Sequence, residues 1–385
     1  MNLTIPHIQK TFSHYKDKVK RKAQGALPYD YLVPSGVYEE QWDWDAFFMG
    51  MALSSQDSKE AIYLKNWTLN FIHNARVDGY TPGCVTPKGR DERLNQMKPF
   101  LAQGAYYASQ FLNDFDWLAP HYEKLKTIVI YREKNLWNKK YNLAVWFNSM
   151  ESGADNNLAA LNFPDKKVVA TDLNSYLYLE YIALSLIAAK LKNQKDEKIF
   201  NKKAQDIKKN TNKYLWDEKY SAYYNLDSRN GKFIKRISFN SFHPLWTHIA
   251  PPERAKKFIE KYAINPKKMW SKYGIRTLSK DDPGYNNINM IKPHSNWQGP
   301  IWPIANYLYM HSLLNYGYQN KAIELAQKIT KLCLLDIEKT RGMHENYNAE
   351  TGEPLAAPNF ISWNLSVANM LKEATTNTNP FKLNI

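Results

Sequence analysis

Apolar residues recur at helical spacing along most of the chain. Residues 58–76 read SKEAIYLKNWTLNFIHNAR, in which large apolar residues return every three or four positions behind a serine. This spacing places them on one face of an α-helix, and serine favours a helix start. Thr171 and Asp172 give another start signal, and Gly317 gives a stop signal. The same helical pattern occurs in residues 98–114, 117–137, 171–192, 197–217, 251–264, 299–317, 318–338 and 361–374.

Strand signals are sparse by comparison. Residues 220–238 indicate one hairpin, with Asn230 and Gly231 at its turn. No Gly/Ser-rich or Pro-rich linker divides the chain, so we expect residues 1–385 to form a single all-α domain of roughly ten to twelve paired helices. A ring of helix pairs with long loops at one end fits this pattern. An open solenoid fits it equally well, because periodicity alone does not separate the two.

The loops between the helices mix aromatic and polar residues. Aromatic residues make up 14% of the chain, with 12 Trp and 26 Tyr, and many stand beside Asp, Asn, Gln or Gly. Such loops can build a polar cleft in which aromatic faces stack on a sugar ring while carboxylates bind its hydroxyls. The four loops are VPSGVYEEQWDWD, WFNSMESGADNN, HSNWQGPIWP and GMHENYNAETGEPLAAPNFISWN.

The net charge of +15 raises the question of a nucleic-acid partner. The lysines are scattered, however, and in residues 190–209 charged and apolar positions alternate as on the solvated face of an amphipathic helix. We therefore expect no nucleic-acid partner. The positive field would attract a small anionic substrate, or would serve solubility alone.

The cysteines and the hydropathy of the chain indicate whether it is a disulfide-bonded, metal-binding, secreted or membrane protein. Cys84 and Cys333 form no metal-binding or disulfide pattern. The N-terminus lacks the apolar run of a signal peptide, and no segment approaches the roughly 20 apolar residues that span a bilayer. We expect a cytoplasmic protein with no membrane partner, and the sequence predicts no particular oligomeric state.

Two carboxylates stand out in MESGADNN. Glu151 and Asp155 lie four positions apart, with Gly153 between them. If a helix began here, both carboxylates would face the same way. Alternatively, Glu151 supports or caps the loop and Asp155 caps a helix.

A third carboxylate, Glu345, lies beside His344 in HENYNAETG, whereas Glu350 is expected to be a solvated turn residue. No second histidine stands at ligand spacing from His344, so we expect no metal site. Two carboxylates from distant loops, surrounded by tryptophans, fit glycoside hydrolysis, in which one is protonated and the other ionised. An aromatic cleft can raise the pKa of the acid by desolvation.

Four motifs together resemble a known family. YDYLVPSGVYEEQWDWDAFF, ESGADN, NWQGPIWP and HENYNAETGEPLAAPNFISWN occur in this order within residues 28–370. They are similar to the inverting glycoside hydrolases of family 63, and most to the bacterial branch of mannosylglycerate and glucosylglycerate hydrolases. ESGADN and the last motif also resemble the trehalases. The resemblance implies an (α/α)6 barrel, a toroid of helix pairs with its cleft among long loops at one end, and no cofactor.

The same resemblance assigns roles to residues. Asp155 would be the general acid and Glu345 the general base. In the first motif, the tryptophans would form walls against the sugar, Asp45 would bind hydroxyls and Asp43 would brace the loop. The implied substrate-binding residues are Tyr38, Trp42, Trp44, Asp45, Gln103, Gly153, Trp297, Gln298 and Trp302.

The substrate is expected to carry a negative charge. The eukaryotic enzymes of the family have a large N-terminal β-domain, to which nothing here corresponds, and this favours the bacterial branch. Its glycerate group would need a cationic or hydrogen-bonding pocket, and we select Arg90 for it. A solvated basic loop explains each candidate equally well. The candidates are Lys88, Arg90, Arg93 and Arg236.

The leading hypothesis is therefore an inverting α-glycosidase acting on glucosylglycerate or mannosylglycerate. A trehalase-like or oligosaccharide α-glucosidase is the first alternative. A sugar-binding protein without catalysis is the second, although the presence of both candidate carboxylates argues against it. The sequence does not distinguish glucose from mannose, because these sugars differ in the orientation of one hydroxyl.

Overall fold

Helices dominate the structure. The computed structural model describes residues 3–92, 95–163, 165–290 and 295–383, and these residues contain twelve α-helices. The predicted helix count is confirmed, and each segment with helical spacing contains a helix. The helices are α1 (Ile5–Ser13), α2 (Asp43–Ser54), α3 (Ala61–Asn74), α4 (Leu101–Leu112), α5 (Tyr122–Asn135), α6 (Thr171–Lys190), α7 (Gln194–Tyr214), α8 (His243–Trp246), α9 (Pro252–Phe258), α10 (Pro303–Asn315), α11 (Gln319–Thr340) and α12 (Val367–Thr376).

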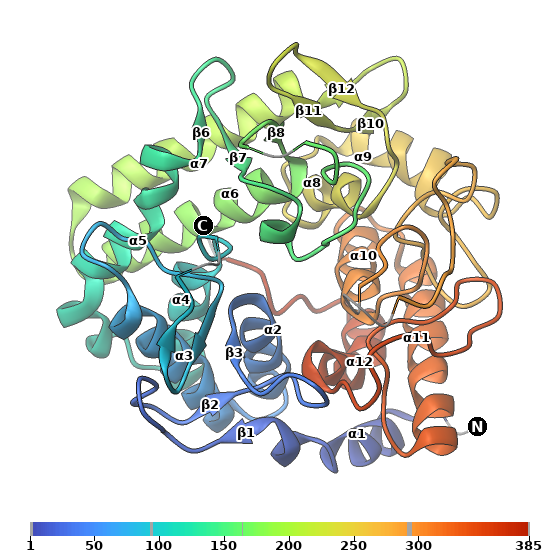
Figure 1. Cartoon of the computed structure of the whole chain (residues 1–385), viewed down its shortest axis with the longest axis horizontal. Helices are drawn as coiled ribbons and strands as arrows, with labels where there is room; N and C mark the ends of the chain where they lie inside the picture. Colours follow the sequence, from blue (N-terminus) through green and yellow to red (C-terminus); the bar gives the residue numbers. More distant parts are fainter. Residues whose placement is uncertain (1–2, 93–94, 164, 291–294, 384–385) are drawn as a thin grey trace.

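Alternate helices surround a common centre (Figure 1). In chain order, α2 contacts α4, α4 contacts α6, α6 contacts α8, α8 contacts α10, and α10 contacts α12. The 3₁₀ helix Ser362–Ser366, which leads into α12, contacts α2 and closes the circle. Helices α3, α5, α7, α9 and α11 lie outside this inner set (Figure 1). The contacts therefore follow a closed order, which an open solenoid does not have.

The inner and outer helices differ in their exposure. Every residue of α2 is buried, as expected for a helix of the inner set. In α7 only Asp196, Phe200, Ala204, Ile207 and Thr211 are buried, and their spacing of three or four residues forms one inward stripe. None of the helices in the described ranges is long and apolar enough to cross a membrane.

Short antiparallel strands connect the helices, so the expectation of an all-α chain with one hairpin needs correction. Strands of two to four residues are too short to show the alternating pattern that identifies a strand in sequence. They form four small sheets: β1 (Lys20–Arg21) with β2 (Tyr31–Leu32); β3 (Gln41–Trp42), β4 (Cys84–Thr86) and β5 (Gly89–Arg90); β6 (Trp137–Asn138), β7 (Leu143–Trp146), β8 (Val168–Val169), β11 (Asn225–Asp227) and β12 (Lys232–Ile234); and β9 (Trp216–Asp217) with β10 (Ala222–Tyr223).

The predicted hairpin is present within the largest of these sheets. Strand β11 pairs with β12, with Asn225 opposite Ile234, and Gly231 has the positive φ of 73° that its turn requires. The other edge of β11 pairs with β8, so the hairpin is the end of a five-stranded sheet.

Three of the four motifs lead into the N-terminal ends of inner helices. Trp42 directly precedes α2, and Lys98 lies three residues before α4. Trp302 directly precedes α10, and Trp363 lies in the 3₁₀ helix before α12. Segments that are far apart in sequence are thereby brought to one end of the ring. The partial positive charge of the helix N-termini favours carboxylates at this end.

Candidate active site

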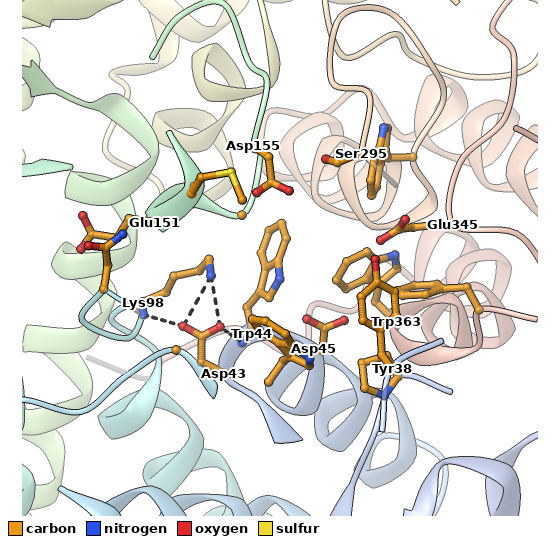
Figure 2. A pocket seen from close by; sticks show the side chains of 18 of the residues that line it. Tyr38, Asp43, Trp44, Asp45, Lys98, Glu151, Asp155, Ser295, Glu345 and Trp363 are labelled. Carbon is orange, nitrogen blue, oxygen red and sulfur yellow. Dashed lines mark hydrogen bonds and ion pairs between the residues drawn. The ribbon is translucent and has the colours of Figure 1, made fainter. Parts of the chain in front are cut away.

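One pocket collects the four motifs (Figure 2). Both predicted catalytic carboxylates and six of the predicted substrate-binding residues line it: Asp155, Glu345, Tyr38, Trp42, Trp44, Asp45, Gly153 and Trp302. The other lining residues are Pro34, Asp43, Gly83, Asn95, Gln96, Lys98, Met150, Glu151, Ser295, Phe360 and Trp363.

The two aspartates of the first motif have different surroundings. Asp43 accepts hydrogen bonds from the backbone N–H of Trp44 and of Lys98, each at 2.7 Å. Its carboxylate therefore ties the start of α2 to the segment before α4, as expected of a residue that braces the loop. Asp45 accepts a 2.7 Å hydrogen bond from the hydroxyl of Ser362, and its side chain faces the pocket.

Asp155 follows a tight turn. The 3₁₀ helix Met150–Ser152 ends at Gly153, whose φ is 77°. A Cβ on Gly153 would lie 2.7 Å from the ring of Trp44, so only glycine allows this close approach. The next residue after Asp155, Asn156, accepts a 2.6 Å hydrogen bond from the N–H of Trp297 and holds the loop in place.

Glu151 points away from the centre of the pocket, toward Arg132 (Figure 2). The carboxylate and the guanidinium form a fully buried ion pair at 2.8 Å. Arg132 also donates to the carbonyl of Met97 at 3.0 Å, and so connects the acid loop with the segment that carries Lys98. Of the two interpretations of Glu151, the structure favours the supporting one.

Glu345 lies on an extended segment held on both sides. Its N–H donates to the carbonyl of Ala356 at 2.8 Å. Next to it, Asp336 accepts hydrogen bonds from the N–H of His344 and the hydroxyl of Tyr347, both at 2.8 Å, and lies 2.9 Å from His344 Nδ1. His344 is thus engaged by a carboxylate. In the described part of the chain, no group of three or more His, Cys, Asp or Glu residues is placed to hold a metal ion.

Three carboxyl groups face the same space, and burial raises the pKa of each. Burial raises the pKa of Glu345 well above its usual value, and the charges of Asp45 and Asp155 add to the rise. Burial raises the pKa of Asp155 to about 7, although the charge of Lys98 opposes this. Burial likewise raises the pKa of Asp45 to about 7. At neutral pH the three groups therefore carry fewer than three negative charges.

Aromatic side chains form the walls of the pocket. The rings of Trp44 and Trp363 meet edge to face with centroids 5.1 Å apart. Trp302 lines the pocket and stacks on the buried ring of Trp297 at 4.0 Å, so Trp297 supports the wall from behind. Burial raises the pKa of Tyr38, and the charges of Glu345, Asp45 and Asp155 add to the rise.

Four predicted substrate-binding residues are absent from the lining. Gln103 is buried within α4, where its amide donates to the carbonyls of Pro99 and Tyr176 at 2.7 and 3.2 Å. Gln298 donates to the carbonyl of Asn156 at 2.9 Å and holds the acid loop. The third is Trp297, described above, and the fourth is Arg90.

Arg90 is selected, among other basic candidates, to bind the anionic group of the substrate. Those that the structure describes lie outside the pocket lining or are paired with other residues. Arg90 pairs with Glu92 and donates to the carbonyl of Asn74 at 3.0 Å. Arg236 donates to Asp282 at 2.5 Å, and Lys88 is exposed outside the pocket lining. Arg93 lies outside the described residues.

Sequence reasoning missed several lining residues. Lys98 precedes Pro99 at a predicted helix start, where a lysine is usually solvated, and no local signal marks it as part of a pocket. Ser295 lies in the quoted loop HSNWQGPIWP and Trp363 in the last motif, so their positions in these segments could have identified them.

Comparison with known proteins identifies the family. The model of the mannosylglycerate hydrolase MGH1-like glycoside hydrolase domain matches residues 38–363. The curated mannosylglycerate hydrolase of Rubrobacter radiotolerans is 25% identical over 153 residues, covering 40% of this chain and 33% of that protein. The mannosyl-oligosaccharide glucosidase of Saccharomyces cerevisiae is 24% identical over 274 residues, covering 63% of this chain and 32% of that protein. The chain thus spans about a third of the length of these two relatives.

Solved structures show the same fold. The GH63 mannosylglycerate hydrolase of Thermus thermophilus, in complex with Tris and D-glycerate, superposes with a TM-score of 0.74 at 17% identity, covering 95% of this chain and all of that one. The neutral trehalase of Saccharomyces cerevisiae superposes with a TM-score of 0.69 at 16% identity, covering 98% of this chain and 83% of that one. Because the family model matches most of the chain, this protein belongs to the family of the mannosylglycerate hydrolase MGH1-like glycoside hydrolase domain.

Proposed function

We propose that this protein is an inverting glycoside hydrolase that cleaves the α-glycosidic bond of a small glucoside or mannoside, with glucosylglycerate or mannosylglycerate as the preferred substrate. One observation carries the proposal: Asp155 and Glu345, from loops 190 positions apart, line the same pocket and point into the same space (Figure 2). Tryptophan walls and the buried Asp45 beside them suit the ring and hydroxyls of a sugar.

The two carboxyls divide the proton transfers. Asp155, protonated near neutral pH because of its raised pKa, gives its proton to the glycosidic oxygen as the bond to the anomeric carbon breaks. Because burial raises the pKa of both carboxyls, the active form is the one in which Asp155 holds a proton and Glu345 is ionised. In this form Glu345 takes a proton from the water that attacks the anomeric carbon from the opposite face. The products are a free sugar of inverted configuration and the released alcohol. An inverting site needs roughly 6.5–9.5 Å between the carboxyls to hold this water.

The fold is proposed to be the (α/α)6 barrel of the family. The closed order of contacts among the inner helices and the superposition on the Thermus thermophilus enzyme both support this assignment. The pocket then occupies one end of the toroid, among the segments that precede the inner helices.

The choice of glycerate as the leaving group rests on the relatives. A mannosylglycerate hydrolase is among the curated matches, and a structure of the Thermus thermophilus enzyme contains D-glycerate. A specific observation favours a second candidate, trehalose: the periplasmic trehalase of Escherichia coli matches 84% of this chain at 20% identity.

A substrate screen tests the proposal. Purified protein is incubated with glucosylglycerate, mannosylglycerate and trehalose, and released hexose is measured. Proton NMR in the first minutes should show the β anomer, because inversion converts an α-glycoside into a β sugar. Initial release of the α anomer would contradict inversion, and faster cleavage of trehalose would select the second candidate.

Variants test the residue assignment. Asp155→Asn and Glu345→Gln should each lower kcat/KM by roughly 10²–10⁴-fold. Asp114→Asn, which neutralises a partly exposed carboxylate paired with Lys65, serves as the control and should leave activity unchanged. Full activity in either catalytic variant would refute the assignment.

A further inference from the structure

Lys98 brings the only permanent positive charge to the described lining of the pocket. The carboxyl-bearing residues in that lining are Asp43, Asp45, Glu151, Asp155 and Glu345. The side chain of Lys98 is 8% exposed, and its Nζ lies 3.1 and 3.5 Å from the two carboxylate oxygens of Asp43, whose side chain is 1% exposed. The catalytic scheme proposed above assigns no task to this ion pair.

The position of the ammonium group is tightly defined. Asp43 is fixed by the backbone N–H groups of Trp44 and Lys98, and it holds the Lys98 side chain in turn. The ammonium lies 5.1 Å from the ring centroid of Trp44, and a Cβ on Gly153 would come within 2.9 Å of Lys98 Cε. Figure 2 shows the ammonium end directed between Asp43 and the space beneath Asp155.

Such a pair gives little net stability, because removing two charges from water costs about as much as their attraction returns. Its chemistry nevertheless suits a hydroxyl group. An ammonium has three N–H donors and no acceptor, whereas a carboxylate only accepts. Asp43 already accepts from the backbone N–H groups of Trp44 and Lys98 and from the ammonium, so its task is to hold Lys98, whose remaining N–H can donate to the oxygen of one ligand hydroxyl. Hydrogen bonds to charged groups are also stronger than those between neutral groups.

We propose that Lys98, held in place by Asp43, is a specificity-determining residue that binds one ring hydroxyl of the sugar whose glycosidic bond is cleaved. This inference rests on the proposed function, and it adds a recognition element on the wall opposite Glu345. The ligand class is a neutral pyranose, recognised at a single hydroxyl.

A cycle of enzyme and substrate changes tests this role. Wild type and Lys98→Met are compared on the glycoside that wild type cleaves and on its 2-, 3-, 4- and 6-deoxy derivatives. At one position the wild type should lose roughly 10- to 100-fold in kcat/KM when the hydroxyl is removed. Lys98→Met should show a similar loss on the parent glycoside but no further loss at that position. At the other positions, removal of the hydroxyl should lower kcat/KM by the same factor in both enzymes.

Two further variants separate recognition from charge. Lys98→Arg keeps the charge but moves the donors, so the penalty at the selected hydroxyl should change while the pH profile stays the same. Lys126→Met removes a partly buried lysine paired with Asp196 outside the pocket, and it should change no ratio.

Each outcome decides the proposal. Equal penalties in wild type and Lys98→Met at every position would overturn it, and so would a Lys98→Arg enzyme with wild-type ratios throughout. A shift of the alkaline limb in Lys98→Met without any change in ratios would show that Lys98 acts only through its charge. If wild type cleaves no glycoside at all, the proposed function itself fails, which is a separate result. The Lys98→Arg comparison also decides the question if Lys98→Met does not fold.

Discussion

The guanidinium of Arg276 donates two hydrogen bonds to one carboxylate oxygen of Glu350, from Nε at 3.1 Å and from Nη2 at 2.8 Å. Lys280 and the hydroxyl of Tyr285 donate to the same carboxylate at 2.9 and 2.6 Å. Glu350 is an exposed turn residue, as predicted, and the structure adds partners that the turn sequence alone does not indicate. Its partners lie 65 to 74 positions earlier in the chain, and they tie the turn after Glu345 to the body of the protein.

Neutralising this carboxylate should weaken the fold in a pH-dependent way. Burial raises the pKa of Glu350, but hydrogen bonds from Lys280, Tyr285 and Arg276 outweigh it and lower the pKa to about 2. Glu350→Gln should reduce the free energy of unfolding at pH 7 by roughly 1–2 kcal/mol, a figure kept small because 39% of the side chain is exposed.

Urea unfolding at several pH values measures this effect. A lowered pKa stabilises the fold fully above the ordinary value of 4.5, and the contribution disappears as the pH falls toward 2. The difference between wild type and Glu350→Gln should shrink over that window. Glu353→Gln, in the same turn but in an exposed pair with Lys339, should change stability by no more than about 0.5 kcal/mol. Equal effects of the two variants would contradict the prediction.

Gly153 should tolerate no side chain. Gly153→Ala introduces a Cβ at 2.7 Å from Trp44 and requires a φ of 77°, so both the loop before Asp155 and the tryptophan wall must move. We expect a loss of roughly 1–3 kcal/mol in stability and at least a tenfold loss in kcat/KM.

Gly317→Ala separates the cost of the positive φ from the cost of the contact with Trp44. Gly317 has a similar φ of 82°, but a Cβ there meets nothing within 4 Å. This control should show the backbone cost alone and full activity. Thermal unfolding and steady-state kinetics of both variants provide the comparison, and an active Gly153→Ala enzyme would disprove the close approach.

A substrate with a better leaving group should distinguish the general-acid role of Asp155 from the general-base role of Glu345. Fluoride departs without a proton, so Asp155→Asn should hydrolyse the α-glycosyl fluoride at close to the wild-type rate while losing roughly 10²–10⁴-fold on the glycoside. Glu345→Gln should lose both activities, because water must be activated in either reaction. Fluoride release is followed with an ion-selective electrode. The opposite pattern would exchange the two roles.

The alkaline limb of the pH profile should report on Asp155. Burial raises the pKa of Asp155 to about 7, and the acid acts only while protonated, so kcat/KM for the glycoside should fall as the pH rises through this value. For the fluoride substrate, which needs no acid, the alkaline limb should be absent. An alkaline limb shared by both substrates would assign it to another group.

Much of this architecture could be predicted from the sequence, because helix periodicity and motif order are local signals. The helices and the turn at Gly231 follow from such signals, and so do the pocket positions of Asp155 and Glu345. The short strands could not be predicted, since two to four residues show no period. The pocket position of Lys98 and the partners of Glu350 were missed for a related reason: Asp43 and Arg276, which contact them, are distant in the chain and close only in space.

The hydrogen bond from Ser362 to Asp45 joins positions 317 apart, near the two ends of the matched family domain. Contacts of such long range form late, because a large loop must close before they can stabilise anything. The helices can therefore assemble while the pocket is still incomplete, and hydrolytic activity becomes a reporter of the final folding step. In refolding from denaturant, the far-UV circular dichroism signal should recover before catalysis does. Ser362→Ala should widen that delay without slowing the recovery of the helices.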